Sequence, residues 1–279
     1  MFERAVILGL GLMGGSLGLA MRTRGLARQV LGVDRNGETL AKAEALGAID
    51  RGLTELEEAV HGANCIVLAT PVGQIPALLE RLAPLVGPEA LVTDLGSVKT
   101  QIVECGARML GARFVGGHPM AGSERSGIEA ARADLFTGAA WAVVSGSTHS
   151  ELETTTLSRL VGLVEALEAR PIFLDGPQHD RLVALVSHLP HLLSFAFAGT
   201  VHADPDAVQA RSLAGGSYRD LMRVAQSDPL LWQGILQANR AALLQSLSDY
   251  RDVLAELESA LRSEDPSLLR SLLLSLPRN

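Results

Sequence analysis

The feature that most constrains the fold is a run of closely spaced glycines directly after an apolar segment near the N-terminus. The strand candidate Arg4–Gly9 leads into Gly9, Leu10, Gly11, Leu12, Met13 and Gly14. One glycine permits a tight turn, a second lets the backbone approach a pyrophosphate, and a third lets the following helix pack closely on the strand. The N–H groups at the start of that helix favour the negative charge of phosphates. The pattern predicts a strand, turn and helix that bind a dinucleotide.

An acidic residue at the end of the next strand candidate, Gln29–Asp34, supports a dinucleotide site. Asp34 follows Gly14 by twenty residues, where a carboxylate accepts hydrogen bonds from the adenine ribose hydroxyls. A glycine-rich turn used only for packing would leave Asp34 unexplained. The charge of Asp34 would repel a 2′-phosphate, so NAD is favoured over NADP. The neighbouring Arg35 leaves NADP open, because a guanidinium there could hold a 2′-phosphate.

The first 175 residues alternate short apolar runs with helical patterns. Further strand candidates are Cys65–Thr70, Leu91–Asp94, Arg113–Gly116, Trp141–Val144 and Pro171–Leu174, and the helical stretches between strands are Glu38–Leu46, Gln74–Leu85, Val98–Leu110 and Leu152–Leu167. Continuous apolar strands separated by helices indicate a parallel sheet covered on both faces. This part is therefore an α/β, Rossmann-type doubly wound domain over residues 1–175.

The pattern after Asp175 is helical only. Asp180–Gly199 is apolar nearly all round, which predicts a buried helix. Asp228 as N-cap and Pro229 at the first helical position begin a helix of more than thirty residues, and Asp265-Pro266 begins a last short one. We expect an all-α helical domain over residues 176–279.

A heptad-like stripe of large side chains lies on the predicted long helix. Its members recur at spacings of three and four and are Leu243, Leu247, Tyr250, Leu254, Leu257 and Leu261. The stripe has two interpretations: packing inside a helical bundle, or a subunit interface, since it is longer than a small domain needs to bury.

Composition excludes several classes of function. The formal net charge is −7 and aromatic residues make up 4%, so we expect no nucleic-acid partner and no basic membrane-binding face. The uncharged run Ala5–Met21 contains five glycines, a poor composition for a membrane helix, and we identify no other apolar stretch of about 20 residues. Cys65 and Cys105 form neither a disulfide framework nor a zinc pattern. We expect a cytoplasmic protein.

Polar residues follow three of the strand candidates, at the edge where doubly wound sheets bind ligands. Thr70 and Pro71 follow one strand and are expected beside the cofactor; the segments Asp94–Lys99, which contains Ser97, and Gly116–Glu124 follow the next two. His118 stands between two glycines and a proline, which predicts a loop position. A histidine there can exchange a proton near neutral pH, and the alternative is a loop histidine bonded to backbone.

The helical half adds further polar groups. His179, His188 and His191 do not form a metal site, because no carboxylate or cysteine pair completes the spacing. We expect His188 in the core and His191, after a proline, facing a cavity. One of the two arginines in Gly215–Arg223 could bind a substrate carboxylate; alternatively they lie on a solvated helix face.

These motifs, in this order from Val6 to about Pro229, resemble the prephenate/arogenate dehydrogenases of tyrosine biosynthesis. The runs His-Pro-Met-Ala-Gly-Ser-Glu at 118–124 and Ser-His-Leu-Pro-His at 187–191 carry the resemblance most specifically. It implies NAD-dependent oxidative decarboxylation of a cyclohexadienyl substrate: prephenate to 4-hydroxyphenylpyruvate, or arogenate to tyrosine. It also implies a homodimer formed by the helical domain, and a monofunctional form without a mutase extension or a regulatory domain.

The resemblance assigns roles to residues of this chain. His118 would bond the C4 hydroxyl and help take its proton, and Ser97 would contact that hydroxyl and orient the histidine. Arg223 would bind a substrate carboxylate with His191 nearby, and His191 beside the side chain of the substrate fits the keto acid prephenate better than arogenate. Two further positions, Glu124 and His179, would line the pocket. Tyrosine, a product analogue, would inhibit by competing for the same pocket.

Two other functions fit part of the sequence. The β-hydroxyacid dehydrogenase and imine reductase group shares the glycine turn, but its chains usually present a catalytic lysine after the nucleotide domain, whereas Lys99 is the last lysine here. A non-catalytic NAD-binding regulator would tolerate replacement of His118, Ser97 and Arg223.

Overall fold

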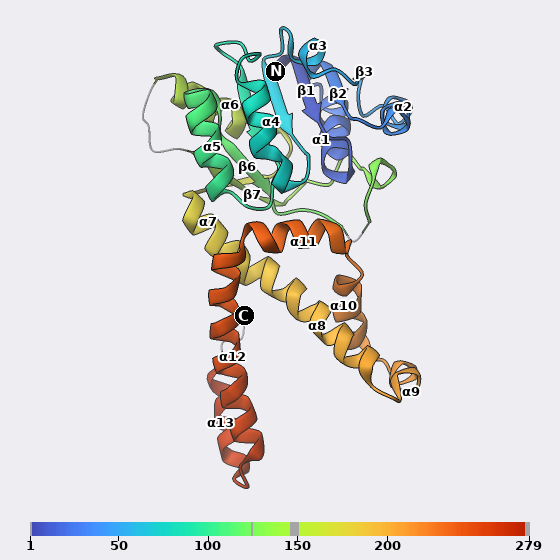
Figure 1. Ribbon diagram of the computed structural model, residues 1–279, viewed down its shortest axis with the longest axis vertical. Coiled ribbons are helices and arrows are strands. Elements are labelled where there is room, and N and C mark those ends of the chain that lie inside the picture. Colours follow the sequence, from blue (N-terminus) through green and yellow to red (C-terminus); the bar gives the residue numbers. More distant parts are fainter. Residues whose placement is uncertain (1, 124, 146–150, 277–279) are drawn as a thin grey trace.

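The computed structural model describes residues 2–123, 125–145 and 151–276. An α/β part holds the N-terminus, and helices extend from its lower side as two separate arms (Figure 1). The expected α/β domain followed by a helical region is confirmed.

A five-stranded parallel sheet forms the centre of the α/β part. Its strands are β1 (Phe2–Leu8), β2 (Ala27–Val33), β3 (Arg51–Leu53), β4 (Cys65–Leu68) and β5 (Leu91–Asp94), in the order β3-β2-β1-β4-β5. Of the four strands predicted for this sheet, β5 has the expected bounds, and β1, β2 and β4 begin or end up to two residues away from them. The strand β3 was not predicted. A strand of three residues carries too short a pattern to recognise.

Helices cover both faces of this sheet, and strand alternation separates two apolar clusters. Ile7 and Val67 face one side, where α1 (Leu12–Thr23), α2 (Gly37–Ala45) and α6 (Glu151–Ala166) pack, while Val6 and Ile66 face the other. The second side is covered by α3 (Leu56–Val60), α4 (Ile75–Leu82) and α5 (Thr100–Leu110). The doubly wound arrangement is confirmed.

A second sheet continues beyond β5 and corrects the expectation of uniformly parallel strands. It consists of β6 (Gly116–Pro119), β7 (Ala140–Val144) and β8 (Arg170–Leu174); β6 and β7 are antiparallel, and β7 and β8 are parallel. The strand expected at Arg113–Gly116 begins three residues later, because Gly111–Arg113 forms a 3₁₀ turn. His118 consequently lies on a strand, opposite Ala142, and the predicted loop position is wrong.

The helical region begins directly after β8. Its elements are α7 (Gly176–Val183), a π-helical turn (Ala184–His188), α8 (Leu189–Ala203), α9 (Ala207–Ser212), α10 (Gly216–Ala225), α11 (Pro229–Ala238), α12 (Arg240–Arg262) and α13 (Pro266–Ser275). The side chains of Asp228 and Asp265 cap α11 and α13 as predicted. The single helix of more than thirty residues is wrong: it breaks at Asn239, whose amide bonds to α7 and the π turn.

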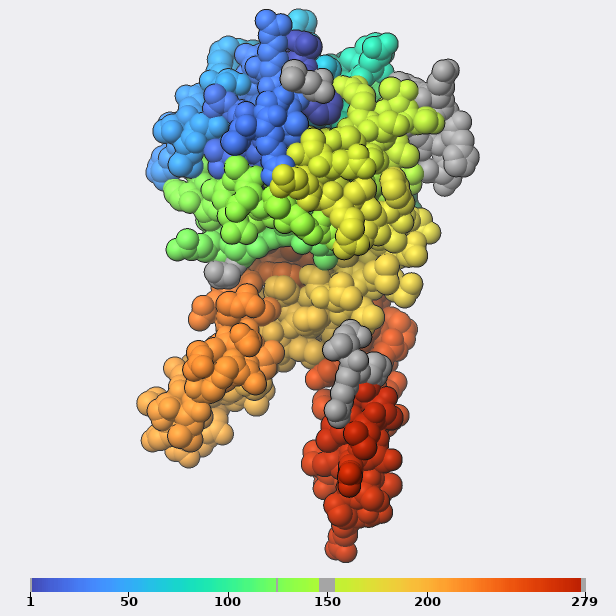
Figure 2. All heavy atoms as spheres, turned by 180° about the vertical axis from the view of Figure 1, so that it is seen from behind, coloured from blue at the N-terminus to red at the C-terminus, as the bar shows by residue number. Residues whose placement is uncertain are grey.

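The two arms leave much apolar surface uncovered. One arm holds α8, α9 and α10 and the other holds α12 and α13, with open space between them (Figures 1 and 2). All but three of the large hydrophobic side chains exposed in the described part of the chain lie beyond residue 176. In the stripe on α12, Leu243 is buried and Leu247 and Leu257 are half-buried, whereas Tyr250, Leu254 and Leu261 are exposed. Packing within this chain therefore covers the start of the stripe and leaves most of its later part open.

The apolar helix over Asp180–Gly199 is not buried in the single chain. Leu185 and Val186 are exposed, and within α8 only Leu189 and Ser194 are buried. The helical run Gly176–Ala203 is long and apolar enough to cross a membrane, judged by length and composition only, which corrects the expectation that no further apolar stretch of about 20 residues exists. The core helix of a soluble protein can have the same length and composition.

Candidate active site

The glycine turn has the geometry that a bound pyrophosphate needs. Gly9 adopts φ +95°, and a Cβ there would lie 2.8 Å from the carbonyl oxygen of Ala69. A Cβ on Gly14 would lie 2.0 Å from the carbonyl oxygen of Gly9, whereas one on Gly11 would meet nothing within 4 Å. The first and third glycines are therefore required by packing, and the second keeps open the space in front of the N-terminus of α1.

Two polar side chains border this space. The carboxylate of Asp34 accepts hydrogen bonds from the backbone N–H groups of Leu10 (3.1 Å) and Asn36 (2.9 Å), which hold it at the end of β2 beside the glycine turn. The Thr70 hydroxyl, after β4, is buried and has no hydrogen-bond partner among the described residues. Arg35 is exposed. Open backbone N–H groups, a ribose-binding carboxylate and an unpaired hydroxyl together fit NAD.

Three buried side chains form a hydrogen-bonded chain at the boundary between β6 and α7. His118 Nδ1 lies 2.8 Å from His179 Nε2, and His179 Nδ1 lies 2.8 Å from Asp180 Oδ1. His118 is 7% exposed and His179 is fully buried. The α/β part supplies the first histidine and the helical part supplies the second histidine and the carboxylate.

The carboxylate determines the tautomers along this chain. Burial alone would raise the pKa of the Asp180 carboxyl, but hydrogen bonds from His179, Thr100 and the Lys99 backbone outweigh burial and lower that pKa. An ionised carboxylate only accepts, so in its neutral form the His179 ring carries its proton on Nδ1 and accepts through Nε2. His118 must then donate from Nδ1, which leaves a lone pair on His118 Nε2.

The surroundings keep His118 neutral. Burial, with the nearby His179, Lys99 and His188 acting in the same direction, lowers the pKa of His118 well below its usual value. A neutral imidazole with a free lone pair can accept a proton, so the geometry leaves His118 Nε2 available as an acceptor.

The segment that follows β5 contains Ser97, and its backbone bonds to Asp180 at the end of the hydrogen-bonded chain from His118. The backbone N–H groups of Lys99 and Thr100 donate to the Asp180 carboxylate at 2.7 and 2.9 Å. Ser97 is half-buried, and its hydroxyl has no hydrogen-bond partner in the described part of the chain. The structure does not join Ser97 to His118 by a hydrogen bond.

A second group of aromatic and polar side chains extends from Asp180 into the helical part. The Asn239 amide donates to the Asp180 carbonyl (2.7 Å) and to His188 Nδ1 (3.0 Å). His188 packs edge-on against Trp232, and the ring of His191 stacks on Trp232 with centroids 3.5 Å apart. Burial lowers the pKa of His188 to about 4, so His188 is the neutral core residue that the sequence predicts.

Arg223 lies on α10, close enough to His191 for its charge to act on that ring. Arg223 is exposed and its positive charge adds to the effect of burial in lowering the pKa of His191. It lines a cavity of about 430 Å³ whose wall is made of Arg211, Tyr218, Arg219, Met222, Arg223 and Gln226. His191 is half-buried, and its Nδ1–H group donates to the Ser187 carbonyl at 2.9 Å. Glu124 lies outside the described residues.

Sequence reasoning assigned no role to several residues that build this site. Asp94, Lys99 and Asp180 are fully or almost fully buried, and Asn239 and Trp232 connect Asp180 to His191. One signal was available: Asp94 and Lys99 are charged residues on either side of a glycine in an otherwise apolar stretch. Asn239 gives no such signal, because a helical pattern runs through it. Across the described ranges, no cluster of three or more His, Cys, Asp or Glu side chains could hold a metal ion.

Family models match both parts of the chain. The nucleotide-binding domain of prephenate dehydrogenase matches residues 17–172, and the dimerization domain of prephenate dehydrogenase matches residues 175–274.

Individual relatives agree with the family models. The prephenate dehydrogenase of Bacillus subtilis (strain 168) is 30% identical over 269 residues, which cover 95% of this chain and 72% of that protein. The crystal structure of prephenate dehydrogenase from A. aeolicus with hydroxyphenyl propionate and NAD+ matches with TM-score 0.91 and 30% identity, covering 98% of this chain and 96% of that one. Synechocystis arogenate dehydrogenase matches with TM-score 0.82 and 33% identity, covering 98% and 96% of the two chains.

Proposed function

The chain belongs to the prephenate dehydrogenase family, and from that premise we propose that it oxidatively decarboxylates prephenate to 4-hydroxyphenylpyruvate with NAD. The observation that carries the proposal is the buried chain from His118 through His179 to Asp180. It presents a neutral base at the boundary between the nucleotide-binding part and the helical part.

The reaction needs a proton acceptor at the C4 hydroxyl of the substrate. The hydride leaves C4, the carboxylate on C1 leaves as CO2, and the electrons of the broken C1–CO2 bond complete the aromatic ring. Bound NAD supplies the hydride acceptor. His118 Nε2 takes the proton of the C4 hydroxyl as the hydride departs, so the electrons of the O–H bond stabilise C4. It returns this proton to the same oxygen when loss of CO2 forms the phenol, so no net proton is released. The half-buried Ser97 hydroxyl, which lacks a partner among the described residues, serves as a second contact for that hydroxyl.

The chain has groups that fit the nicotinamide cofactor. The turn Gly9–Gly14 and the start of α1 would hold the pyrophosphate, and Asp34 would accept from the adenine ribose. Thr70 and Pro71 would lie beside the nicotinamide half. The Asp34 charge favours NAD over NADP, although Arg35 is close enough in sequence to serve a 2′-phosphate once Asp34 is removed.

Arg223 is the proposed partner of a substrate carboxylate. Prephenate is a dianion, and the cavity at α10 contains three arginines. His191, held by its stack on Trp232 and by the Ser187 carbonyl, lies near Arg223 and is uncharged at neutral pH because its pKa is lowered by burial. Because Nδ1 of the neutral His191 donates to the Ser187 carbonyl, Nε2 can only accept, and this geometry does not select a 2-oxo side chain over an ammonium group. The preference for prephenate over arogenate stays a prediction from the sequence. Glu124 and a competitive mode of tyrosine inhibition remain predictions.

The helical part supports a homodimer. The family model that matches residues 175–274 is a dimerization domain, and the exposed apolar side chains of the π turn, α12 and α13 require a cover. A second copy provides that cover, and it also accounts for the apolar run Gly176–Ala203 without a membrane. We place the domain boundary at residues 175 and 176 and the enzyme in the cytoplasm.

Steady-state turnover tests the proposal. NADH formation is measured with NAD and with prephenate or arogenate offered separately, for the wild type and for His118→Asn. We expect faster turnover of prephenate and a loss of about two or more orders of magnitude in the variant. No turnover of either substrate, with NAD or with NADP, would refute the assignment and favour the β-hydroxyacid dehydrogenase class. Equal turnover by the variant would favour another base.

A further inference from the structure

Asp94 is a fully buried carboxylate to which the proposed function gives no role. It ends β5, and its Oδ2 pairs with the ammonium group of Lys99, which is also fully buried. An ion pair of this kind gives little net stability, because desolvation of both charges offsets their attraction. Its retention under the active site calls for another explanation.

The backbone pairing between β5 and the following strand stops at Asp94. The Val115 N–H donates to the Val92 carbonyl at 3.0 Å, as in a regular parallel ladder. In such a ladder the next N–H of this strand to donate to β5 is that of Gly117, and its acceptor would be the Asp94 carbonyl. Instead the Gly117 N–H donates to the side-chain Oδ1 of Asp94 at 3.2 Å. The carboxylate therefore replaces the ladder where the two sheets separate.

The same carboxylate holds the turn on its other side. Asp94 Oδ2 accepts from the Gly96 N–H at 2.8 Å. Gly96 directly precedes Ser97, and Gly117 directly precedes His118. One buried carboxylate thus fixes the backbone immediately before both residues that contact the C4 hydroxyl in the proposed reaction.

Lys99 holds this carboxylate in place through the buried ion pair. Burial lowers the pKa of Lys99, and the neighbouring Asp94 opposes that shift. The methylene chain of Lys99 packs under Gly116, where an added Cβ would lie 3.3 Å from Cδ. The Lys99 backbone N–H donates to Asp180, so the segment also reaches the far end of the His118–His179 chain.

We propose that Asp94, neutralised by Lys99, is a positioning residue that holds the Ser97 turn and the His118 strand in one fixed relation. The inference rests on the proposed function. It predicts that losing the second acceptor oxygen moves His118 relative to Ser97 without emptying the cofactor site, whose glycine turn and Asp34 lie on other strands.

The test uses variants that remove the acceptor without leaving a buried charge unpaired. Asp94→Asn retains the shape but offers one acceptor oxygen for two backbone donors, and it leaves Lys99 unpaired, so it can fail to fold. Asp94→Asn combined with Lys99→Met removes the unpaired ammonium. Arg51→Met is the matched control, because it breaks the exposed ion pair of Arg51 with Glu58 far from the site. Each is made with His118 present and with His118→Asn.

The wild type is assayed first with prephenate and with arogenate; if neither is turned over, the proposed function fails and this inference falls with it. For an active wild type we expect kcat of the Asp94→Asn, Lys99→Met double variant to fall about 100-fold. The KM of the double variant for NAD, and its NAD affinity measured by calorimetry, should stay within about twofold of the wild-type values. In a protein that already carries His118→Asn, the two substitutions should lower kcat by less than about a further threefold. Arg51→Met should match the wild type.

Two results would overturn the inference while leaving the proposed function intact. One is a double variant with native kcat, or with an equal loss whether or not His118 is present, since a positioning role must act through His118. The other is a double variant that does not fold or does not bind NAD, which would assign the ion pair to the fold of the nucleotide-binding part.

Discussion

Replacing Asp180 by asparagine tests the hydrogen-bonded chain most directly. In the native structure Asp180 Oδ1 accepts from His179 and from the Lys99 backbone, and Oδ2 accepts from the Thr100 backbone. Asparagine has one acceptor oxygen. With its oxygen toward Thr100, its NH2 group faces His179 Nδ1 and reverses the tautomer of both histidines. His118 then carries its proton on Nε2 and cannot act as a base.

The magnitude follows from the hydrogen bond that sets the tautomer. A hydrogen bond to a charged group contributes about 1.5 to 3 kcal/mol. Since each 1.4 kcal/mol is a factor of ten, kcat should fall about 10- to 150-fold. The KM for prephenate should change little, because Asp180 lies behind His179 and does not reach the pocket. Stability should fall by about 1 kcal/mol, since Asp180 also caps the start of α5.

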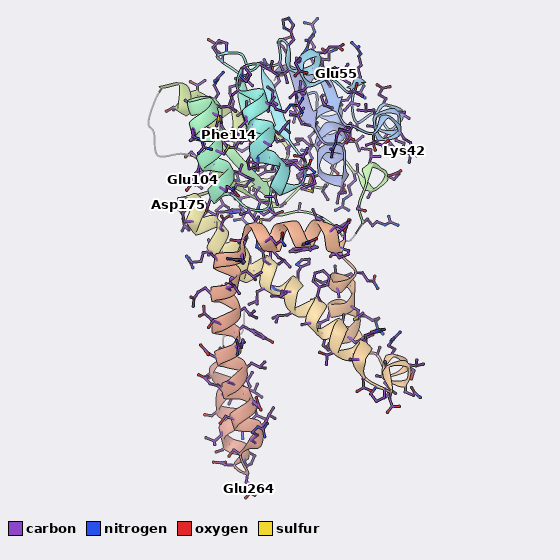
Figure 3. All side chains as sticks on the ribbon, in the orientation of Figure 1. Lys42, Glu55, Glu104, Phe114, Asp175 and Glu264 are labelled. Atoms are coloured by element: carbon purple, nitrogen blue, oxygen red, sulfur yellow. The ribbon has the colours of Figure 1, made fainter. Side chains whose placement is uncertain are left out.

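The assay is NADH formation at saturating NAD and prephenate, with a thermal melt of each protein. Asp175→Asn is the control: the Asp175 side chain caps α7 through the Gln178 N–H (2.7 Å) at the start of that helix (Figure 3). Asp175 bonds to His179 only through its backbone carbonyl, which the substitution leaves in place. Asparagine is an equally good cap, so the control should keep native kcat. Native kcat in folded Asp180→Asn, or a full additional loss when it is combined with His118→Asn, would refute the reasoning.

Three further predictions follow from the site. Arg223→Met should raise the KM for prephenate about 10- to 100-fold with a smaller change in kcat, because a charged hydrogen bond to a carboxylate is lost; an unchanged KM would place the carboxylate elsewhere. Asp34→Ser should lower kcat/KM with NAD about 10-fold and raise it with NADP, as the repulsive carboxylate is removed beside Arg35, and unchanged preference would exclude Asp34 from the ribose site. His188 has a folded pKa of about 4 against 6.5 unfolded, so the unfolded chain binds more protons between these values. The contribution of neutral His188 to the unfolding free energy, measured by urea titration, should therefore be complete above pH 6.5 and fall by up to about 3 kcal/mol as the pH drops to 4. His188→Gln should lose less stability over this pH range than the wild type, and an equal loss in both proteins would contradict the prediction.

The cofactor half of the site could be predicted from the sequence because its determinants are local. A glycine turn needs particular backbone freedom at particular spacings, and Asp34 ends the neighbouring strand, so chain order alone brings them together. Helix starts at Asp228 and Asp265 were predictable for the same reason: each cap bonds N–H groups two or three residues away.

For the catalytic half of the site, the sequence predicts which residues take part but not how they contact one another. Its motifs identify His118 and His179, but the contact between them joins residues 61 apart through two domains. The strand position of His118 was missed because Gly-Gly-His-Pro has no strand pattern. It forms a strand only because β7 pairs with it.

The sequence by itself determined the order of elements, the dinucleotide turn and its acidic partner, and the residue types available for the chemistry. These depend on backbone sterics, strand and helix periodicity, and bonds within a few residues. Only the tertiary structure decided which nitrogen of His118 is free, that its proton affinity is lowered by burial, and that Asp94 and Asp180 hold the two sides of the site. Tautomer and pKa are set by the groups that surround a side chain in space, and those groups come from β5, β6, α5, α7 and α12, which are far apart along the chain.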